Sequence, residues 1–251
     1  MRSFEPEPRP TRRGFFCLAA GAFLGGSCQE GPRKGALIAA ASSLRELLTG
    51  SLQDFPGAAP EFSFDASSSL ARQIRAGARF DAFLSADQHA LKRVGEWGRA
   101  KPAPFLSNRL SLIARHGVVL DHEWKDPGEL ARYQGAIAIG APEVPVGRYT
   151  RECLGETAFT SLEGRFVHVR NARGILGLVE GGSADFGFIY HSDLTRMQKS
   201  TKLWVSSKGA PPDIRYWAQL SRASLSNEAQ AYFDWILSGG LRGLALELGF
   251  A

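Results

Sequence analysis

The stretch EFSFDASSSLARQIRAGARFDAFLSADQ, Glu61–Gln88, decides the fold of this chain. It begins as a strand, EFSFDA, and continues as a helix in which Leu70 and Ile74 have helical spacing and Gly77 marks the end. A second strand, DAFLSA, follows. The residues before Glu61 contribute a buried strand, ALIAAAS, and a helix, SLRELLTGSL, whose leucines also have helical spacing. The order β-α-β-α-β predicts a parallel sheet with right-handed crossovers.

The same order occurs a second time, which predicts two similar lobes. Its strands and helices are, in turn, GAIAIGAP, GRYTRECLG, RFVHVR, ARGILGLVEGG and DFGFIY. Between the two series, the prolines of KPAPFLSNRLSLIAR and the strand Leu110–Ala114 indicate a passage from one lobe to the other. The helical segment SNEAQAYFDWILSGG and its tail are too short for a third lobe, so we expect them to pack on the first. The predicted lobes are residues 35–107 with 217–251, and residues 108–216.

The composition is that of an ordinary globular protein. The chain has 251 residues, of which 44% are hydrophobic and 22% charged, and its glycines and prolines follow no fixed period. The net charge of +5 is spread too evenly for a nucleic-acid surface, which needs clustered Lys and Arg with stacking aromatics. These observations argue against a repeat protein, a disordered protein and a nucleic-acid-binding protein.

Residues 1–28 are typical of an export signal, with an Arg-bearing start, the apolar run Gly14–Leu24 and small residues after it. The motif TRRGFF resembles the twin-arginine signal, although general secretion stays an alternative. LGGSC resembles a lipoprotein processing site that would lipidate Cys28, but Leu24 lies four residues before the cysteine where the pattern has three. Lipidation of Cys28 and simple cleavage nearby both stay open. With residues 29–34 as a linker, we expect an exported protein that is periplasmic or lipid-anchored.

The sequence carries none of the common catalytic or metal-binding patterns. G-x-S-x-G, S-x-x-K, H-E-x-x-H and the P-loop pattern are missing, and no histidine has ligand spacing to another among His89, His116, His122, His168 and His191. Cys153 is the one thiol beyond the signal, and RECLG predicts a buried small residue at the end of a helix. We therefore predict no enzyme activity, no cation site and no cofactor.

Four helices are predicted to begin directly after strands, and their starts carry the candidate chemistry. Ser43 lies three residues before Glu46 in a capping-box pattern, and Ser67, Ser68 and Ser69 precede Leu70. VPVGRY and RNARGIL begin the other two helices. Free N–H groups at helix starts carry positive charge, and in a parallel sheet they face the ligand crevice, which predicts a site for a small anion. The alternative is that these serines are ordinary N-caps.

At these residues the chain resembles the molybdate-binding protein family, the extracytoplasmic substrate-binding components of ABC transporters for molybdate and tungstate. The blocks that carry the resemblance are AAASSL, SSSLARQIRAGARFDAFLSADQ, SNRLSLIA, VPVGRY, NARGILGLVE, GFIY and ELGF, in family order over Ala36–Phe250. The resemblance implies a two-lobed α/β periplasmic-binding-protein fold of type II. Each lobe would be a mostly parallel sheet flanked by helices, with the ligand cleft between the lobes. It also implies a monomer that delivers its ion to an ABC permease.

The resemblance also places the oxyanion contacts. They fall on the hydroxyl and N–H of Ser43 and Ser67, on the backbone N–H of Val146 and Ala172, and on the Tyr190 hydroxyl. Ser43 precedes the leucine of its motif, and Ser42 is the neighbouring alternative. The chain departs from the family at GAP, residues 140–142, where many relatives have GDP, which leaves the role of that loop open.

Three other functions stay open from the residues alone. The same fold could bind sulfate or another oxyanion, and molybdate and tungstate are too similar in size to be separated. An exported hydrolase could use Ser43 or Ser67 as a nucleophile, which would require a histidine within hydrogen-bond reach. A sensory or scaffolding lobe would bind no transported ligand.

Overall fold

The computed structural model describes residues 35–251 except 119–122, 208–210 and 225. The predicted export signal with Cys28, the linker and His122 lie outside the described residues. Within the described part of the chain, no helix has both the length and the hydropathy needed to cross a membrane.

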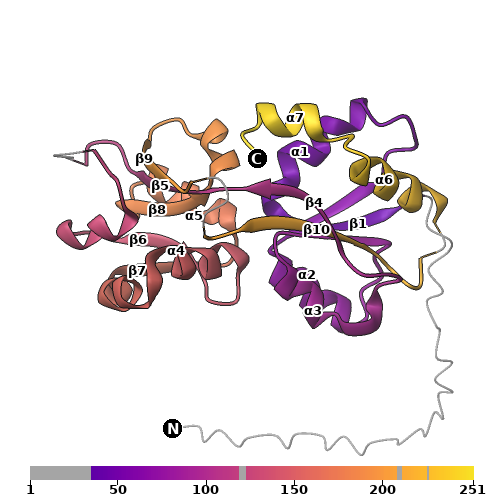
Figure 1. Cartoon of the computed structure of the whole chain (residues 1–251), viewed down its shortest axis with the longest axis horizontal. Helices are drawn as coiled ribbons and strands as arrows, with labels where there is room; N and C mark the ends of the chain where they lie inside the picture. Colours follow the sequence, from indigo (N-terminus) through magenta and orange to yellow (C-terminus); the bar gives the residue numbers. More distant parts are fainter. Residues whose placement is uncertain (1–34, 119–122, 208–210, 225) are drawn as a thin grey trace, which may run out of the picture. The chain divides into compact units, whose positions relative to one another are not determined.

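The first sheet has the strand order β2-β1-β3-β10-β4 (Figure 1). Its strands β1 (Leu37–Ala41), β2 (Glu61–Asp65) and β3 (Ala82–Ser85) are parallel, as the opening stretch predicts. β10 (Ile214–Leu220) and β4 (Ala103–Asn108) extend the sheet by antiparallel pairing.

The second sheet repeats this arrangement in the order β7-β6-β8-β5-β9. Here β6 (Ile137–Gly140), β7 (Phe166–Val169) and β8 (Phe186–Tyr190) are parallel. The antiparallel strands are β5 (Leu110–Ala114) and β9 (Thr201–Val205). The prediction of two β-α-β-α-β series is confirmed. The chain passes from the first sheet to the second between β4 and β5 and returns between β9 and β10.

Helices follow the parallel strands in both halves. The α-helices are α1 (Arg45–Gly50), α2 (Ser67–Arg75), α3 (Gln88–Arg93), α4 (Pro145–Leu162), α5 (Ala172–Glu180), α6 (Asn227–Leu237) and α7 (Arg242–Glu247). The described residues also contain six 3-10 turns: Ser42–Leu44, Ser51–Gln53, Gly95–Trp97, Pro127–Arg132, Glu163–Arg165 and His191–Arg196.

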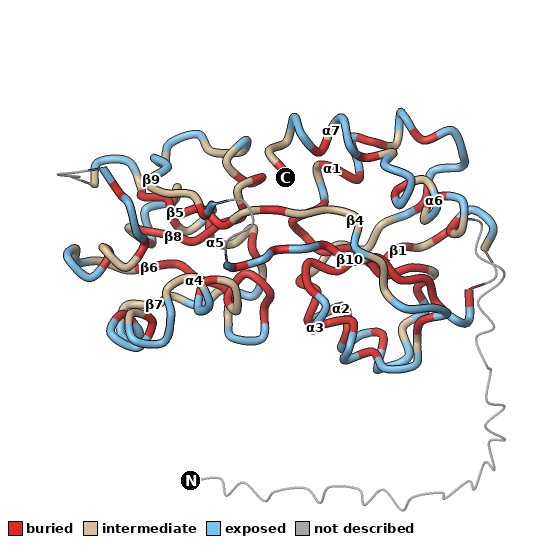
Figure 2. The backbone as a smooth tube through the Cα atoms, viewed as in Figure 1, coloured by how far each residue is buried: buried red, intermediate tan, exposed pale blue. Residues whose placement is uncertain are grey.

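Strand β1 is buried on both faces, as expected for a parallel strand covered by helices on either side. Ile38 packs in one core cluster with the leucines of the first helix, and its neighbour Ala39 packs in a second cluster with Leu70 and Ile74 of α2. Figure 2 shows the central strands buried and the outer turns of the helices exposed. The burial continues past the end of β1 through Ser42, Ser43 and Leu44, so the turn that follows the strand also lies inside the protein.

The C-terminal helices pack on the first half, as the sequence predicts. The ring of Tyr232 in α6 lies edge-on to Phe55 at 5.1 Å, and α7 lies beside α1 (Figure 1). Helix α4 differs from its prediction, because the chain leaves helical dihedrals at Gly155 (φ 70°) and resumes the helix to Leu162. Cys153 is half-buried rather than buried, and burial raises the pKa of its thiol to about 12.

Candidate functional site

A small cavity lies where the carboxyl ends of the parallel strands of both sheets meet. Its volume is about 10 Å³, far below the ~300–1,000 Å³ that organic ligands usually occupy. Its walls come from the turns after β1, β2, β3, β6 and β7 and from the end of β8. The lining residues are Ala41, Ser42, Ser43, Ala66, Ser67, Ala86, Val144, Pro145, Val146, Ala172 and Tyr190. All five residues predicted to contact the oxyanion are among them.

The first half contributes serine hydroxyls whose oxygens are already held by donors. The Ala86 N–H donates to Ser67 Oγ at 2.9 Å, and the Tyr216 hydroxyl donates to Ser43 Oγ at 3.1 Å. Both serines are buried. An oxygen that accepts a bond from the protein leaves its own hydrogen available for another acceptor. The two hydroxyls can therefore act as donors toward the cavity.

The N-cap interpretation of these serines is wrong. Ala41 and Ala66 occupy the cap positions, and neither turn has a side-chain cap hydrogen bond. Ser67 is the first residue of α2, and Ser43 lies inside the 3-10 turn that precedes α1. Glu46 does not close a capping box with Ser43 but pairs with Arg173 of the other half. The serine hydroxyls are therefore not used to cap a helix and are available to bind a ligand.

The second half contributes backbone N–H groups at two helix starts. In the first turn of α4, the Val144 carbonyl accepts from the N–H groups of Gly147 and Arg148. The Val146 N–H lies too near the helix start to have a partner within the helix, and it has none elsewhere in the described chain. At α5, the Asn171 side chain accepts from Gly174 at 3.1 Å and leaves the Ala172 N–H without a partner among the described residues. These two N–H groups are available at the cavity wall.

Two glycines allow the start of α4 to lie against the end of β6. A Cβ on Gly140 would lie 2.7 Å from the backbone nitrogen of Gly147, and one on Gly147 would lie 2.3 Å from the Gly140 carbonyl oxygen. Either distance is too short for a real contact, so larger residues would push the helix away. Gly140 belongs to the GAP loop, which therefore helps to place Val146 at the cavity.

Tyr190 ends β8 and brings the one aromatic hydroxyl of the cavity wall. Burial, and then the neighbouring Tyr216 and Tyr149, raise its pKa well above the ordinary value, so the hydroxyl keeps its proton. No hydrogen-bond partner for this hydroxyl occurs in the described part of the chain. Because Tyr190 lines the cavity, its hydroxyl is available to donate a hydrogen bond to a guest there.

Charged groups join the two halves beside the cavity without entering its wall. Arg148 pairs with Asp87, and Tyr149 donates to the Ala86 carbonyl at 3.0 Å. At another point of the wall, Arg173 pairs with Glu46, whose carboxylate also lies 3.6 Å from Arg196 Nε. Because Arg148, Arg173 and Arg196 each have a carboxylate partner and no arginine or lysine of the described chain lines the cavity, a guest there would meet neutral donors.

A serine hydrolase finds no support in this arrangement. Within the described ranges, no histidine is hydrogen-bonded to Ser43 or Ser67, and His191 instead lies 3.2 Å from Ser111 Oγ through Nδ1. Burial lowers the pKa of His191 to about 4. The described residues also contain no group of three His, Cys, Asp or Glu side chains that could hold a metal ion.

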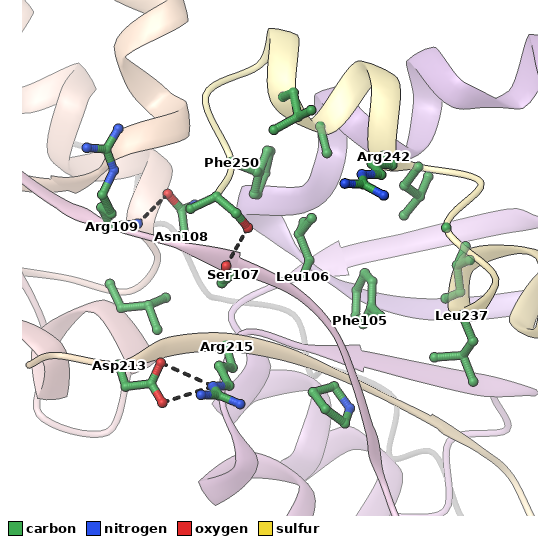
Figure 3. A pocket seen from close by; sticks show the side chains of 18 of the residues that line it. Phe105, Leu106, Ser107, Asn108, Arg109, Asp213, Arg215, Leu237, Arg242 and Phe250 are labelled. Carbon is green, nitrogen blue, oxygen red and sulfur yellow. Dashed lines mark hydrogen bonds and ion pairs between the residues drawn. The ribbon is translucent and has the colours of Figure 1, made fainter. Parts of the chain in front are cut away.

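A larger cavity of about 660 Å³ lies between β4, β10 and the C-terminal helices (Figure 3). Phe105 and Leu106 of β4 line it together with Leu237 and Phe250, and Arg109, Arg215 and Arg242 line it as well. It contains none of the predicted contact residues. Its walls are mixed, because Ser107 and Asn108 also line it and Arg215 is paired with Asp213. The small cavity is favoured as the functional site because the five predicted contact residues line it.

Sequence reasoning missed the residues that support the cavity from behind. Tyr216 and Asn108 lie on β10 and β4, the two antiparallel strands, and Tyr216 stands 173 positions from the serine that it contacts. No local pattern connects them to Ser43. The charged residues Glu46 and Arg148 are inside the predicted motifs, but their partners across the cavity could not be assigned from one sequence.

Comparison with known proteins gives a consistent result. Residues 36–250 match the protein family described as bacterial extracellular solute-binding protein. The molybdate-binding protein ModA of Haemophilus influenzae is 24% identical over 225 residues, which cover 85% of this chain and 89% of that protein.

Two solved structures are similar to the chain. The Azotobacter vinelandii periplasmic molybdate-binding protein has a TM-score of 0.72 at 18% identity, with 86% of this chain and 98% of that one covered. The substrate-binding domain of a putative molybdenum ABC transporter from Clostridium difficile has a TM-score of 0.65 at 26% identity, over 86% and 97% of the two chains. The predicted two-lobed fold of type II is confirmed by these similarities and by the paired sheets.

Proposed function

The chain belongs to the family of bacterial extracellular solute-binding proteins, and on that premise we propose that it captures molybdate or tungstate and delivers it to an ABC permease. The observation that carries this proposal is the convergence of Ser43, Ser67, Val146, Ala172 and Tyr190 on one small cavity. The relatives named for molybdate binding support the choice of ion.

The chemistry of the wall suits a small tetrahedral dianion. Removing such an ion from water costs several kcal/mol or more, so it must be surrounded by donors. Each hydrogen bond to a charged group returns roughly 1.5–3 kcal/mol. The three hydroxyls and the free N–H groups at the helix starts could together offset the loss of hydration. The outcome is binding that is micromolar or tighter once ordering costs are included.

Donors from both halves imply that the ion is enclosed by closure of two lobes. We take the lobes as residues 35–107 with 217–251, and residues 108–216, connected by the crossings at β4 and β10. Hinge closure around a ligand is typical of periplasmic binding proteins. The pairs Glu46–Arg173 and Asp87–Arg148 would then stabilise the closed form. Because these pairs leave no cation in contact with the ion, reopening is enough to release it.

The proposal includes an exported protein without catalytic activity. The signal of residues 1–28 would direct it outside the cytoplasm, with Cys28 either lipidated or removed. It would act as a monomer that needs no cofactor and binds no nucleic acid. Among the oxyanions, discrimination against sulfate would rest on size, because sulfate has the same charge and shape but shorter bonds.

Calorimetric titration of the mature protein with molybdate, tungstate and sulfate tests the proposal. We expect saturable binding of molybdate and tungstate at micromolar or lower concentrations, with sulfate much weaker. Thermal unfolding should shift upward with molybdate, as it must for any ligand that binds the folded state alone. Equal affinity for sulfate would contradict the ion assignment. No stabilisation by any oxyanion would contradict a receptor function altogether.

A further inference from the structure

Asn108, Tyr216 and Ser43 form a chain of hydrogen bonds behind the cavity. The bonds that Asn108 makes determine which group donates and which accepts at each step. The Asn108 Oδ1 accepts from the N–H of Arg109 at 2.8 Å and from the N–H of Ser192 at 3.4 Å. Backbone N–H groups can only donate, so these two contacts fix which end of the amide is the oxygen. The Asn108 Nδ2 therefore points to the other side, toward Ser192 Oγ at 2.9 Å and the Tyr216 oxygen at 3.2 Å.

The direction passes from Asn108 to the serine through Tyr216. Because the amide NH₂ has no acceptor, the Tyr216 oxygen must accept from it and the Tyr216 hydrogen is left for Ser43 Oγ, 3.1 Å away. Tyr216 is fully buried, and burial raises the pKa of its hydroxyl, which keeps that hydrogen in place. Ser43 Oγ thus accepts from behind, and its own hydrogen is free to point into the cavity.

The Ser67 oxygen is also an acceptor, but its donor is a backbone group. Its oxygen accepts from the Ala86 N–H, a donor that cannot reverse. No lining side chain of the cavity carries a carboxylate, and the nearby Glu46 and Asp87 are paired with arginines. The side chains thus offer donors to a guest, while a guest that itself donates a hydrogen finds no committed acceptor among them.

We propose that Asn108 and Tyr216 are positioning residues that hold the Ser43 hydroxyl as a donor, so that the cavity admits fully deprotonated oxyanions and excludes protonated ones such as hydrogenphosphate. This inference rests on the proposed oxyanion function and extends it to selectivity. The P–OH group of a protonated oxyanion would point its hydrogen at a donor hydrogen of the cavity wall, so one hydrogen bond would not form. A cavity that selected ions by size alone would not impose this loss of affinity.

The hydrogen-bond chain from Asn108 through Tyr216 to Ser43, called the relay below, is tested by Tyr216→Phe in two backgrounds, with and without Ser43→Ala. The substitution keeps the ring and its contacts with Tyr190 and Phe250, at 6.1 and 5.7 Å between centroids. With Ser43 present, we expect molybdate affinity to fall about tenfold and inorganic phosphate at neutral pH to begin to compete. In the Ser43→Ala background, Tyr216→Phe should change neither quantity further. An equal loss in both backgrounds would mean that Tyr216 acts through packing and would overturn the inference.

Asn108→Asp provides a second variant of nearly identical shape that reverses the relay. The introduced carboxylate accepts from Tyr216, whose oxygen then accepts from Ser43, so the serine turns its lone pairs toward the cavity. We expect a larger loss of molybdate affinity than for Tyr216→Phe, together with phosphate competition, and both effects should shrink in the Ser43→Ala background. A loss that does not depend on Ser43 would be a simple charge effect and would count against the relay.

The wild-type titrations separate this inference from the proposed function. Wild-type protein should bind molybdate and ignore phosphate. If it binds no molybdate, both the function and the inference fall. If it binds molybdate and both variants reject phosphate as strongly as the wild type does, only the inference falls.

Discussion

The two halves of the molecule have the same strand order but present their donors differently. In the first half, Ser43 and Ser67 offer side-chain hydroxyls whose oxygens are held by other groups. In the second half, Val146 and Ala172 offer backbone N–H groups, and Tyr190 adds a hydroxyl with no partner among the described residues. The shared topology determines where the strand ends meet, while the loop sequences determine the donors. One half should therefore respond to side-chain changes and the other mainly to changes in the backbone.

The largest effect is expected for Ala172→Pro, which removes a backbone donor from the second half. Ala172 is the first residue of α5 and follows Asn171 in an extended conformation (φ −156°, ψ 163°), so proline should fit the helix start. We expect molybdate affinity to fall by about 100-fold, since a bond to a charged group is lost and a ring is added at the wall. Calorimetry measures the loss, and Ala172→Gly, which keeps the N–H, is the control. Similar affinities for the two variants would contradict a backbone contact.

Ser67→Ala should weaken molybdate binding by about tenfold or more, because it removes a donor from the first half. Ser68→Ala is a matched control in the same helix. Its hydroxyl is equally buried, lacks a hydrogen-bond partner and does not line the cavity. Titration of both variants should show a loss for Ser67→Ala alone. Equal behaviour of the two would remove Ser67 from the site.

Tyr190→Phe should cost about tenfold in affinity while the ring packing and the fold stay intact. It tests whether the second half needs a side-chain donor in addition to its backbone donors. Circular dichroism should show an unchanged thermal transition without ligand. The shift of that transition by molybdate should become smaller. An unchanged ligand-induced shift would show that the hydroxyl does not reach the ion.

Smaller effects are expected where the halves touch through charges. Glu46 and Arg173 are partly exposed, with 38% and 24% of their side chains accessible, so their pair is partly screened by water. Glu46→Gln and Arg173→Gln should each lower affinity by about two- to fivefold, and the double variant should lose no more than either single one. Salt should reduce the difference from wild type. Additive losses would mean that the two residues do not act as a pair.

The smallest effect is expected on the pH dependence of the free energy of unfolding, through Asp193, which pairs with Arg196. Burial raises the pKa of this carboxyl from 3.8 to about 6, because the opposing attraction of Arg196 is weaker than the desolvation. The folded state therefore binds the proton more tightly than the unfolded chain, and the free energy of unfolding falls as pH rises from about 4 to 6. Asp193→Asn should remove this decline and be the more stable protein at neutral pH, in chemical denaturation. A wild-type stability that rises over this interval, with no such gain in the variant, would contradict the assignment.

Local patterns predicted the strands and the helix starts, whereas the five contact residues were predicted through the resemblance to the molybdate-binding family. Gly77 ended a helix as expected, and the parallel order of β1, β2 and β3 followed from their short crossovers. The same patterns left an N-cap role open for the serines, because Ser43 and Glu46 have capping-box spacing in the sequence, whereas in the structure the glutamate pairs with Arg173 of the other half. The relay through Tyr216 joins residues distant in the chain, and only the packed sheets bring them together.

A crystal structure of the molybdate complex tests the central claim most directly. We predict the ion in the small cavity, with its oxygens about 2.7–3.2 Å from the hydroxyls of Ser43, Ser67 and Tyr190 and from the N–H groups of Val146 and Ala172, and with no lysine or arginine in contact. An ion bound to a guanidinium group, or in the larger cavity beside β4 and β10, would contradict this account.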